Sequence, residues 1–275
     1  MDNANPELGR PLQTGPYATN VVEAGTGPAA VVLLHGSGAG VTAWANWRGL
    51  LPTLADRFRA IAYDLSGFGY TERAPGMRYD FMDTWIRQLD SLLDELDVGQ
   101  ADLVGNSFGG AVALHYAHQR PDRVRRLVLM GSAGVPMALT PALDSLWGYT
   151  PSVGNMRRVM ETMAFDRSLV TDDLAQMRYE ASFLPGVQEA FAALFPYPRQ
   201  RWLDAMALPD AALGAISSPT LLVHGREDRI IPLQASYDLL ARLPDAQLHV
   251  FGRCGHWTMV ERRDAFNQLV LAFLG

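Results

Sequence analysis

Short apolar runs alternate along this chain with longer stretches in which apolar residues recur every three or four positions. The runs are rich in Val, Leu and Ile, and they lie at Val31–Leu34, Ala60–Tyr63, Asp102–Val104, Leu127–Met130 and Thr220–Val223. Because they lack the apolar–polar alternation of a half-exposed strand, they are typical of strands buried on both faces of a parallel sheet. Val21–Glu23 and Leu248–Phe251 predict two further strands.

Amphipathic stretches with helical periodicity separate these runs. They lie at about Trp44–Ala55, Met82–Leu96, Ser107–Gln119, Leu233–Leu243 and Arg262–Leu274. Repeated strand–helix units at this spacing indicate βαβ connections. The pattern therefore predicts an α/β fold, a mostly parallel central sheet with helices on both faces.

The alternation of strands and helices stops between Gly134 and Leu208. This stretch is rich in Met, Trp, Phe and Pro, and its pattern predicts several helices without strands. We interpret residues 1–133 and 209–275 as one α/β core, and residues 134–208 as a helical cap inserted over it. A cap of this kind closes an apolar substrate chamber, where a bare sheet edge would offer only an open cleft.

Composition and charge exclude several functions. The net charge of −6 gives the protein no electrostatic attraction for nucleic acid or an anionic membrane surface. All 23 basic residues are Arg. Since Schiff-base aldolases, pyridoxal-phosphate enzymes and P-loop nucleotide hydrolases each need a lysine, these three classes are excluded.

The single cysteine, Cys254, can form neither an internal disulfide nor a zinc cage. The segment Met1–Gly15 is polar and lacks the basic start and apolar centre of a secretion signal. No apolar stretch is long enough to span a bilayer. We expect a cytoplasmic protein.

The segment Gly105–Gly109 reads G-x-S-x-G, and it follows one predicted strand and precedes a predicted helix. This is the context of a nucleophile elbow, a sharp turn that presents the serine at the start of a helix. The small residues allow the backbone to turn tightly. We expect Ser107 to be a nucleophile.

A serine hydroxyl needs a base, and the base needs an orienting acid. In the α/β-hydrolase fold these residues follow in the chain order Ser, acid, His, with the His after the last strand. This order selects His256 as the base. For the acid we select Asp228, because a residue this far beyond the strand that ends at His224 can reach inward from a loop. The neighbouring Glu227 is expected to be solvated. The third candidate, Asp64, begins a segment that we interpret as a structural turn.

A glycine-rich loop, His35–Gly40, follows the first parallel strand. It has neither the Lys nor the following Ser or Thr of a phosphate-binding loop. We interpret it as an oxyanion loop, in which the backbone N–H of Ser37 or Gly38 and that of Phe108 bind a developing alkoxide.

One arginine of the predicted cap lies on an apolar helix face. Thr171–Asp173 is a typical helix start, and Leu174, Met177 and Arg178 share one side of the helix that follows. An arginine in apolar surroundings needs an anionic partner. That partner is either an internal acid, such as Glu180, or a substrate carboxylate, and periodicity alone leaves both readings open.

Taken together, these motifs resemble the meta-cleavage product hydrolases, which split carbon–carbon bonds in ring-opened catechols during bacterial aromatic degradation. The resemblance covers the chain from about Thr19 to Phe273. Within the family, the chain is most similar to the branch that acts on monocyclic products. The resemblance is carried by segments 34–38, 43–48, 105–110, 165–171, 178–180, 198–202, 224–228 and 252–257.

The resemblance implies roles for further residues. Arg178 would hold the substrate carboxylate, Asn106 and Asn46 would hydrogen-bond near the dienol end, and Trp257 and Phe108 would line the pocket. The substrate would be a small dienoate, converted to a keto tautomer before the serine attacks its C6 carbonyl. The family needs no metal and no organic cofactor, and it usually forms homo-oligomers.

Three positions depart from the family's pattern, namely Met259, Tyr63 and Met163. They leave the predicted triad intact but leave the preferred substituent at C6 open. Two other functions fit the same triad, a carboxylesterase or lactonase and a non-enzymatic receptor. A dehalogenase or epoxide hydrolase of this fold would need Asp at position 107.

Overall fold

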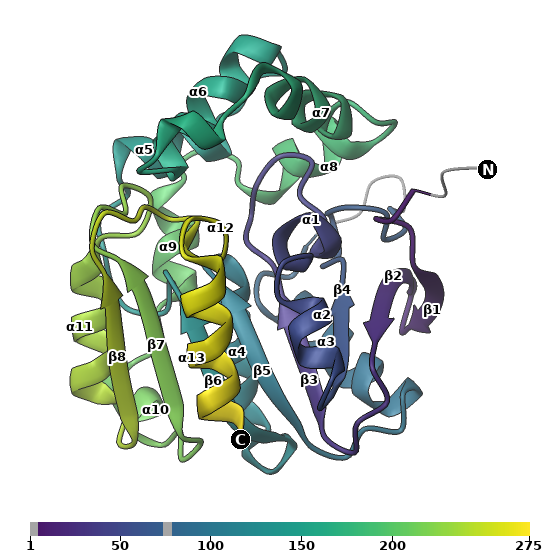
Figure 1. Cartoon of the computed structure of the whole chain (residues 1–275), viewed down its shortest axis with the longest axis vertical. Coiled ribbons are helices and arrows are strands. Elements are labelled where there is room, and N and C mark those ends of the chain that lie inside the picture. Colours follow the sequence, from purple (N-terminus) through teal and green to yellow (C-terminus); the bar gives the residue numbers. More distant parts are fainter. Residues whose placement is uncertain (1–4, 74–78) are drawn as a thin grey trace.

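The computed structural model describes residues 5–73 and 79–275; residues 1–4 and 74–78 of the predicted core fall outside this range. One eight-stranded sheet crosses the molecule in the order β1-β2-β4-β3-β5-β6-β7-β8 (Figure 1). The strands are β1 (Arg10–Thr14), β2 (Tyr17–Ala24), β3 (Ala30–Leu34), β4 (Arg59–Tyr63), β5 (Ala101–Asn106), β6 (Val124–Met130), β7 (Thr220–Gly225) and β8 (Ala246–Phe251).

The sheet is parallel from β4 to β8, and only β1 and β2 run antiparallel to their neighbours. The α/β-hydrolase fold predicted from the sequence, with its mostly parallel sheet, is confirmed. Strand β1 was not predicted. It is a polar edge strand whose residues are largely exposed, so it carries no apolar run.

The helices of the core are α1 (Ala43–Trp47), α2 (Leu51–Ala55), α3 (Asp83–Glu95), α4 (Phe108–Gln119), α10 (Asp210–Gly214), α11 (Leu233–Arg242), α12 (Thr258–Glu261) and α13 (Arg263–Leu274), with a 3₁₀ turn at Pro121–Arg123. The single helix predicted for Trp44–Ala55 is wrong, because two short helices occupy this stretch. Pro52 lies in the first turn of α2, where its missing N–H costs nothing.

Two apolar layers explain why the parallel strands carry uninterrupted apolar runs. Val31 and Leu33 of β3 pack with α1, α2 and α13 on one face of the sheet. Val32 and Leu34 point to the other face, where α3, α4 and α11 cover them. Since successive side chains of a strand point to opposite faces, a strand covered on both sides must be apolar at every position.

Between residues 134 and 208 the chain forms helices and no strand: α5 (Pro141–Trp147), α6 (Val153–Met163), α7 (Asp172–Ser182), α8 (Val187–Leu194) and α9 (Gln200–Met206), with a 3₁₀ turn at Arg167–Leu169. Thr140, Ser152 and Thr171 cap the first turns of α5, α6 and α7 with their hydroxyls. We call α5–α9 the cap helices. Helices α5–α8 lie over the carboxyl ends of the strands, and α9 packs against α4 (Figure 1).

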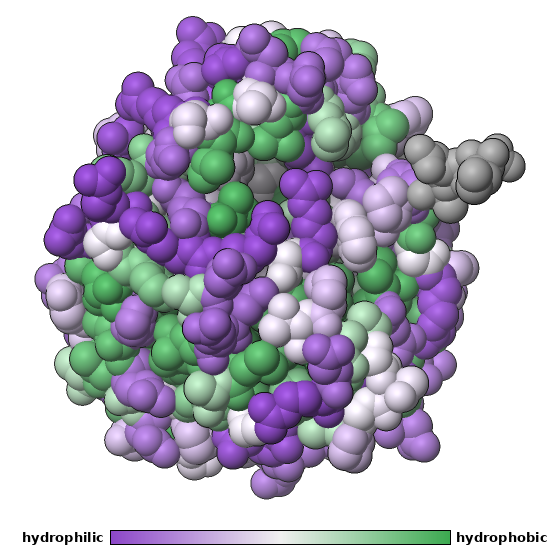
Figure 2. Space-filling model, in the orientation of Figure 1, coloured by the Kyte–Doolittle hydropathy of each residue, from purple (hydrophilic) through white to green (hydrophobic). Residues whose placement is uncertain are grey.

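Several large apolar side chains are exposed on the cap segment: Phe165, Leu169, Met177, Phe183, Leu184 and Tyr197. Apolar patches are visible on this part of the surface among hydrophilic neighbours (Figure 2). Leu169 and Met177 also line a cavity beneath the cap helices, which accounts for their exposure. No helix in the described part of the chain has both the length and the apolar character to cross a bilayer.

The turn from β5 into α4 brings backbone segments unusually close. A Cβ atom at Gly105 would lie 2.6 Å from Gly109 O, and one at Gly109 would lie 2.4 Å from Leu34 O. Because the clashing atoms belong to the backbone, no rotamer change can relieve the contact. Glycine at both positions therefore allows α4 to start directly against the ends of β3 and β5.

We predict that Gly105→Ala lowers the free energy of unfolding by at least about 2 kcal/mol, since the new methyl group overpacks a rigid turn. Gly154→Ala is the matched control. Its Cβ meets open space in the first turn of α6, and it should raise stability by about 0.5–1 kcal/mol. Urea denaturation measures both; equal midpoints for Gly105→Ala and wild type would contradict the packing argument.

Candidate active site

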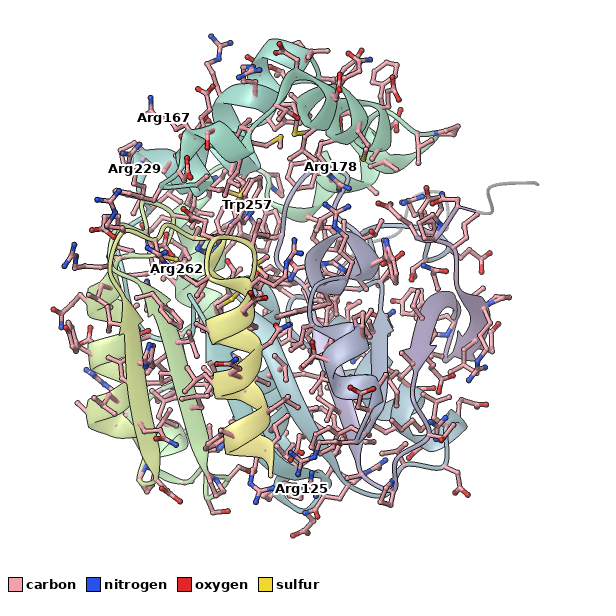
Figure 3. All side chains as sticks on the ribbon, viewed as in Figure 1. Arg125, Arg167, Arg178, Arg229, Trp257 and Arg262 are labelled. Carbon is pink, nitrogen blue, oxygen red and sulfur yellow. The ribbon has the colours of Figure 1, made fainter. Side chains whose placement is uncertain are left out.

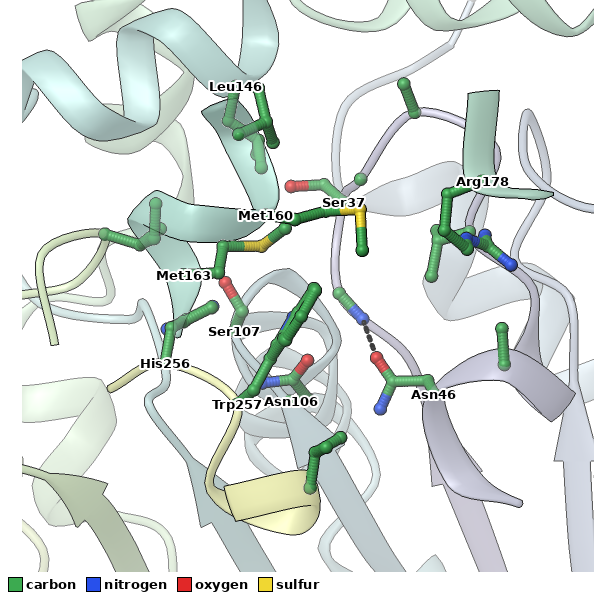
Figure 4. Close-up of a pocket in the computed structure, with 18 of the residues that line it drawn as sticks. Ser37, Asn46, Asn106, Ser107, Leu146, Met160, Met163, Arg178, His256 and Trp257 are labelled. Atoms are coloured by element: carbon green, nitrogen blue, oxygen red, sulfur yellow. Dashed lines mark hydrogen bonds between the residues drawn. The ribbon is translucent and has the colours of Figure 1, made fainter. Parts of the chain in front are cut away.

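Ser107 lies at the turn between β5 and α4 with a left-handed backbone, φ 54° and ψ −113°. Its N–H donates to Met130 O at 2.9 Å, which fixes the turn against β6. The serine is buried but lines a cavity, into which its side chain points (Figure 4). Positive φ is uncommon for any residue other than Gly, and such outliers are concentrated at functional sites.

His256 and Asp228 are joined by a short hydrogen bond. His256 Nδ1 lies 2.6 Å from Asp228 Oδ2, and their side chains are 6% and 1% exposed. Because Nδ1 donates to the carboxylate, Nε2 is the nitrogen left to accept a proton. His256 and Ser107 line the same cavity, and their side chains lie next to each other in Figure 4.

The loop after β7 holds Asp228 in place. Its Oδ1 accepts hydrogen bonds from Ile230 N–H at 2.8 Å and Ile231 N–H at 3.0 Å, which leaves Oδ2 for His256. Burial by itself raises the pKa of this carboxyl, but the charge of His256 and hydrogen bonds from His224 and His256 outweigh it. The pKa of Asp228 therefore lies below its ordinary range, and the group is ionised at neutral pH.

His224 contacts the same carboxylate, which the sequence did not reveal. Its Nε2 lies 3.0 Å from Ile231 O and 3.4 Å from Asp228 Oδ2, and its Nδ1 lies 2.7 Å from Ser236 Oγ. Since a carbonyl oxygen only accepts, Nε2 carries the proton and points it toward both oxygens. His224 thus links the end of β7 to the loop that carries Asp228 and faces the same carboxylate oxygen as His256.

The two rival acids lie in other networks. Glu227 accepts a hydrogen bond from Cys254 N–H at 2.9 Å and pairs with Arg226. Asp64 is buried at the end of β4, where burial raises its pKa to about 6, and it accepts from Ala43 N–H at 2.6 Å. Within the described ranges, Asp228 is the carboxylate that hydrogen-bonds to His256.

His35 holds the glycine-rich loop after β3 in place through two hydrogen bonds. Leu65 N–H donates to His35 Nε2 at 3.0 Å, so Nδ1 carries the proton and donates to Gly36 O at 2.8 Å. Burial lowers the pKa of His35 to about 4, and the ring is neutral at pH 7. Ser37 and Gly38 line the cavity, and Ser37 Oγ accepts from Trp147 Nε1 of the cap at 2.9 Å.

Phe108 begins α4, and the first N–H groups of a helix have no acceptor within that helix. Its side chain, however, does not line the cavity, and this part of the prediction is wrong. The ring packs in the core against Phe68, Trp85 and Phe195. The side chain points into the core because α4 packs against β5 of the sheet.

A cavity of about 1150 Å³, its open mouth included, lies between the core loops and the cap helices. Most of its polar lining comes from the core, namely Ser37, Asn46, Arg48, Asn106, Ser107 and His256, and helix α7 contributes Arg178. Its apolar lining comes largely from the cap: Leu146, Met156, Val159, Met160, Met163 and Leu174. Trp257, beside the His256 loop, also faces this space (Figures 3 and 4). An apolar chamber with a few convergent polar groups is typical of a small-molecule site.

Asn46 and Asn106 lie on the core side of this cavity. Asn46 Oδ1 accepts from Gly36 N–H at 3.4 Å, and Asn106 Nδ2 donates to Met130 O at 3.2 Å. Asn46 Nδ2 is buried and has no hydrogen-bond partner among the described residues. Since an unsatisfied buried donor costs about 1–3 kcal/mol, this amide is a candidate to meet an acceptor on a bound molecule.

Arg178 points from α7 toward the core (Figure 3), and it lies across the cavity from His256 (Figure 4). The internal acid that contacts it is Glu7, whose Oε1 lies 3.4 Å from Arg178 Nη1. Glu180, the acid named from the sequence, hydrogen-bonds to Gln176 instead. Arg178 also donates to Gly40 O. Arg178 therefore has an internal partner, Glu7, and it also lines the cavity.

The departures from the family's pattern lie close to this site. Met163 and Met259 line the cavity, whereas Tyr63 is buried at the end of β4 and does not line it. Cys254 is fully buried beside the His256 loop. Among the residues that the structure describes, no three His, Cys, Asp or Glu side chains are grouped so that they could hold a metal ion.

Comparison with known proteins places this geometry in a family. Residues 29–262 match the family model described as the alpha/beta hydrolase fold. A solved meta-cleavage product hydrolase from Pseudomonas fluorescens IP01 superposes with a TM-score of 0.96 at 47% identity, with 98% of each chain covered. The chain belongs to the meta-cleavage product hydrolases.

Two curated relatives within this family are each 53% identical to the chain. One is a 2-hydroxy-6-oxo-2,4-heptadienoate hydrolase of Pseudomonas putida, with 100% of this chain and 99% of the relative covered. The other is a 2-hydroxymuconate semialdehyde hydrolase of Pseudomonas sp. strain CF600, with 98% and 95% covered. The predicted resemblance to meta-cleavage product hydrolases is confirmed, and the protein is a hydrolase.

We predict that Asp228→Asn lowers kcat for a chromogenic ester about 10⁴-fold without unfolding the protein, because an amide facing Nδ1 favours the wrong imidazole tautomer. Glu227→Gln is the matched control on the same loop and should retain wild-type turnover. Steady-state kinetics and circular dichroism check both. Full activity of Asp228→Asn would mean that another acid orients His256.

Proposed function

We propose that the protein hydrolyses the C5–C6 bond of 2-hydroxy-6-oxo-2,4-dienoates, the ring-opened products of catechols. The products are 2-hydroxypenta-2,4-dienoate and a small carboxylic acid. One observation carries the proposal: one cavity is lined by Ser107 and His256 at one end and by the largely buried cation Arg178 across from them. This arrangement suits a substrate with a carboxylate at one end and a carbonyl at the other.

We assign Ser107, His256 and Asp228 as the catalytic triad. His256 Nε2 takes the hydroxyl proton as Ser107 Oγ attacks the C6 carbonyl, and Asp228 stabilises the imidazolium that forms. The backbone N–H groups of Phe108 and of Ser37 or Gly38 would hold the negative charge on the former carbonyl oxygen.

A carbon leaving group needs an electron sink, and the other end of the substrate supplies one. C5 gains a proton when the dienol becomes the keto tautomer. Cleavage of the C5–C6 bond then leaves electrons that delocalise as a dienolate, which takes up a proton at the C2 oxygen to give 2-hydroxypenta-2,4-dienoate. Water then hydrolyses the acyl group from Ser107. Arg178 would grip the C1 carboxylate, while Asn46 and Asn106 hydrogen-bond near the oxygen at C2.

The cap segment fits this chemistry. We propose that residues 134–208 work as a cap that excludes water from the chamber, because their Met-rich lining forms its apolar wall. The core would then comprise residues 1–133 and 209–275. We also propose that the enzyme forms homo-oligomers, as the resemblance implies, and that it works in the cytoplasm without a metal or organic cofactor.

We predict that Ser107→Ala abolishes turnover of a 6-methyl dienoate, and that Arg178→Ala lowers its kcat/KM at least about 100-fold, since a charge-assisted contact to the carboxylate is lost. Arg167→Ala, an exposed arginine of the cap segment, is the control and should leave turnover unchanged. The loss of dienolate absorbance measures the rate.

A neutral ester distinguishes this function from a carboxylesterase or lactonase, which could use the same triad. Under the proposal, Arg178→Ala leaves the slow hydrolysis of a neutral ester unchanged while dienoate turnover collapses. Efficient turnover of neutral esters, with weak dienoate hydrolysis insensitive to Arg178, would favour the esterase. Binding of dienoate without turnover would indicate a receptor.

We predict that substrates with hydrogen or methyl at C6 exceed the phenyl analogue in kcat/KM by at least about tenfold. Met160 and Met163 lie near Ser107 in the cavity and would crowd a ring at C6 (Figure 4). Met163→Ala should selectively raise turnover of the phenyl substrate. A panel with hydrogen, methyl, isopropyl and phenyl measures this order; equal rates would show that these side chains do not set the preference.

A further inference from the structure

The N-terminal segment reaches the candidate carboxylate site from the far end of the chain. Glu7 Oε1 lies 3.4 Å from Arg178 Nη1, although 171 residues separate them. Their side chains are only 16% and 15% exposed. Glu7 belongs to the segment before β1, whereas Arg178 belongs to cap helix α7. The pair therefore links the cap to the core at the edge of the cavity.

Hydrogen bonds to the core fix the position of Glu7. Asn20 of β2 accepts from Gly9 N–H at 2.8 Å and donates to Glu7 O at 2.9 Å and to Asp64 Oδ2 at 2.9 Å. The N–H of Glu7 donates to Asn5 Oδ1 at 3.0 Å. The backbone at Glu7 is therefore held on both sides, and its carboxylate, which is largely buried, faces Arg178.

The charges around Arg178 give Glu7 an electrostatic role. Burial lowers the pKa of Arg178, and Glu7 is the strongest of the neighbouring charges that favour its cationic form. Arg48 opposes it, lines the same cavity, and makes no side-chain hydrogen bond or ion pair with the rest of the described chain.

The contacts of Arg178 also fix the direction of its guanidinium. One terminal nitrogen faces Glu7 and the other donates to Gly40 O on the oxyanion loop. A guanidinium has five N–H donors in a rigid planar fork, so two anchored contacts leave the others with a set direction. An unanchored arginine would have to be ordered when the substrate binds, at a cost in side-chain entropy.

We propose that Glu7 is a positioning residue of the substrate-carboxylate site: it holds the Arg178 guanidinium in the orientation in which it meets the carboxylate of the dienoate. This inference rests on the proposed function, because it assigns Arg178 to that carboxylate. Glu7 does not touch the substrate. Its effect passes through Arg178 and concerns substrate binding rather than the chemistry at Ser107.

The test compares Glu7→Ala, Glu7→Gln and the control Glu180→Ala in the full-length enzyme. Glu7→Ala should raise KM for the 6-methyl dienoate about tenfold, the size expected for a contact to a charged group, with kcat changed less than about twofold. Glu7→Gln, which keeps an oxygen acceptor, should recover most of this loss. Glu180→Ala, on the same helix as Arg178, should match wild type. Hydrolysis of a neutral ester and the melting temperature should stay the same in all three variants.

A double variant separates positioning from a merely structural role. If Glu7 acts through Arg178, adding Glu7→Ala to Arg178→Ala raises KM no further. Independent losses in the double variant, a KM that falls in Glu7→Ala, or an equal loss with the neutral ester would each overturn the proposal. Failure of the proposed function itself is distinguishable, because Arg178→Ala alone would then leave dienoate turnover intact.

Discussion

The left-handed backbone at Ser107 is the constraint on which the rest of the site depends. Such a conformation costs a residue other than Gly about 1–3 kcal/mol. The turn is stable here because Ser107 hydrogen-bonds to β6 on one side and leads directly into α4 on the other. Gly105 and Gly109 allow this close packing, since a Cβ atom at either position would clash with backbone atoms. The strain therefore presents the hydroxyl of Ser107 at the start of a helix and at the floor of the cavity.

The loops after β7 and β8 complete the rigid half of the site. Two backbone N–H groups hold Oδ1 of Asp228, and its other oxygen, Oδ2, accepts from His256 and also faces His224. The cap supplies the other half, an apolar wall and one cation. Polar contacts between the core and the cap include Trp147–Ser37 and Arg178–Glu7.

The sequence predicted the features that have a local signal. Doubly covered strands must be apolar throughout, and the elbow needs small residues at fixed spacing, so the parallel strands, the elbow and the order of the candidate triad could be derived from residues such as Ser107. The edge strand β1 has no apolar run. The division of the first predicted helix depends on Pro52, whose effect competes with a continuous apolar periodicity.

Contacts between distant segments left no local trace. The pairing of Glu7 with Arg178 and that of His224 with Asp228 depend on where the fold places each loop, and neither spacing nor composition encodes it. The direction of the Phe108 side chain likewise follows from the packing of α4 on the sheet. Sequence reasoning could state that Arg178 needs an anion, because a cation in apolar surroundings always does, but it could not choose the anion.

The most direct test of the central claim is a crystal structure of the Ser107→Ala variant with a 6-methyl dienoate bound. We predict that the substrate carboxylate lies on the Arg178 guanidinium, that the C6 carbonyl carbon lies over residue 107, and that the C6 carbonyl oxygen lies within reach of the Phe108 N–H. A substrate bound in the reverse direction, or with its carboxylate on another group while Arg178 contacts only Glu7 and Gly40, would contradict it.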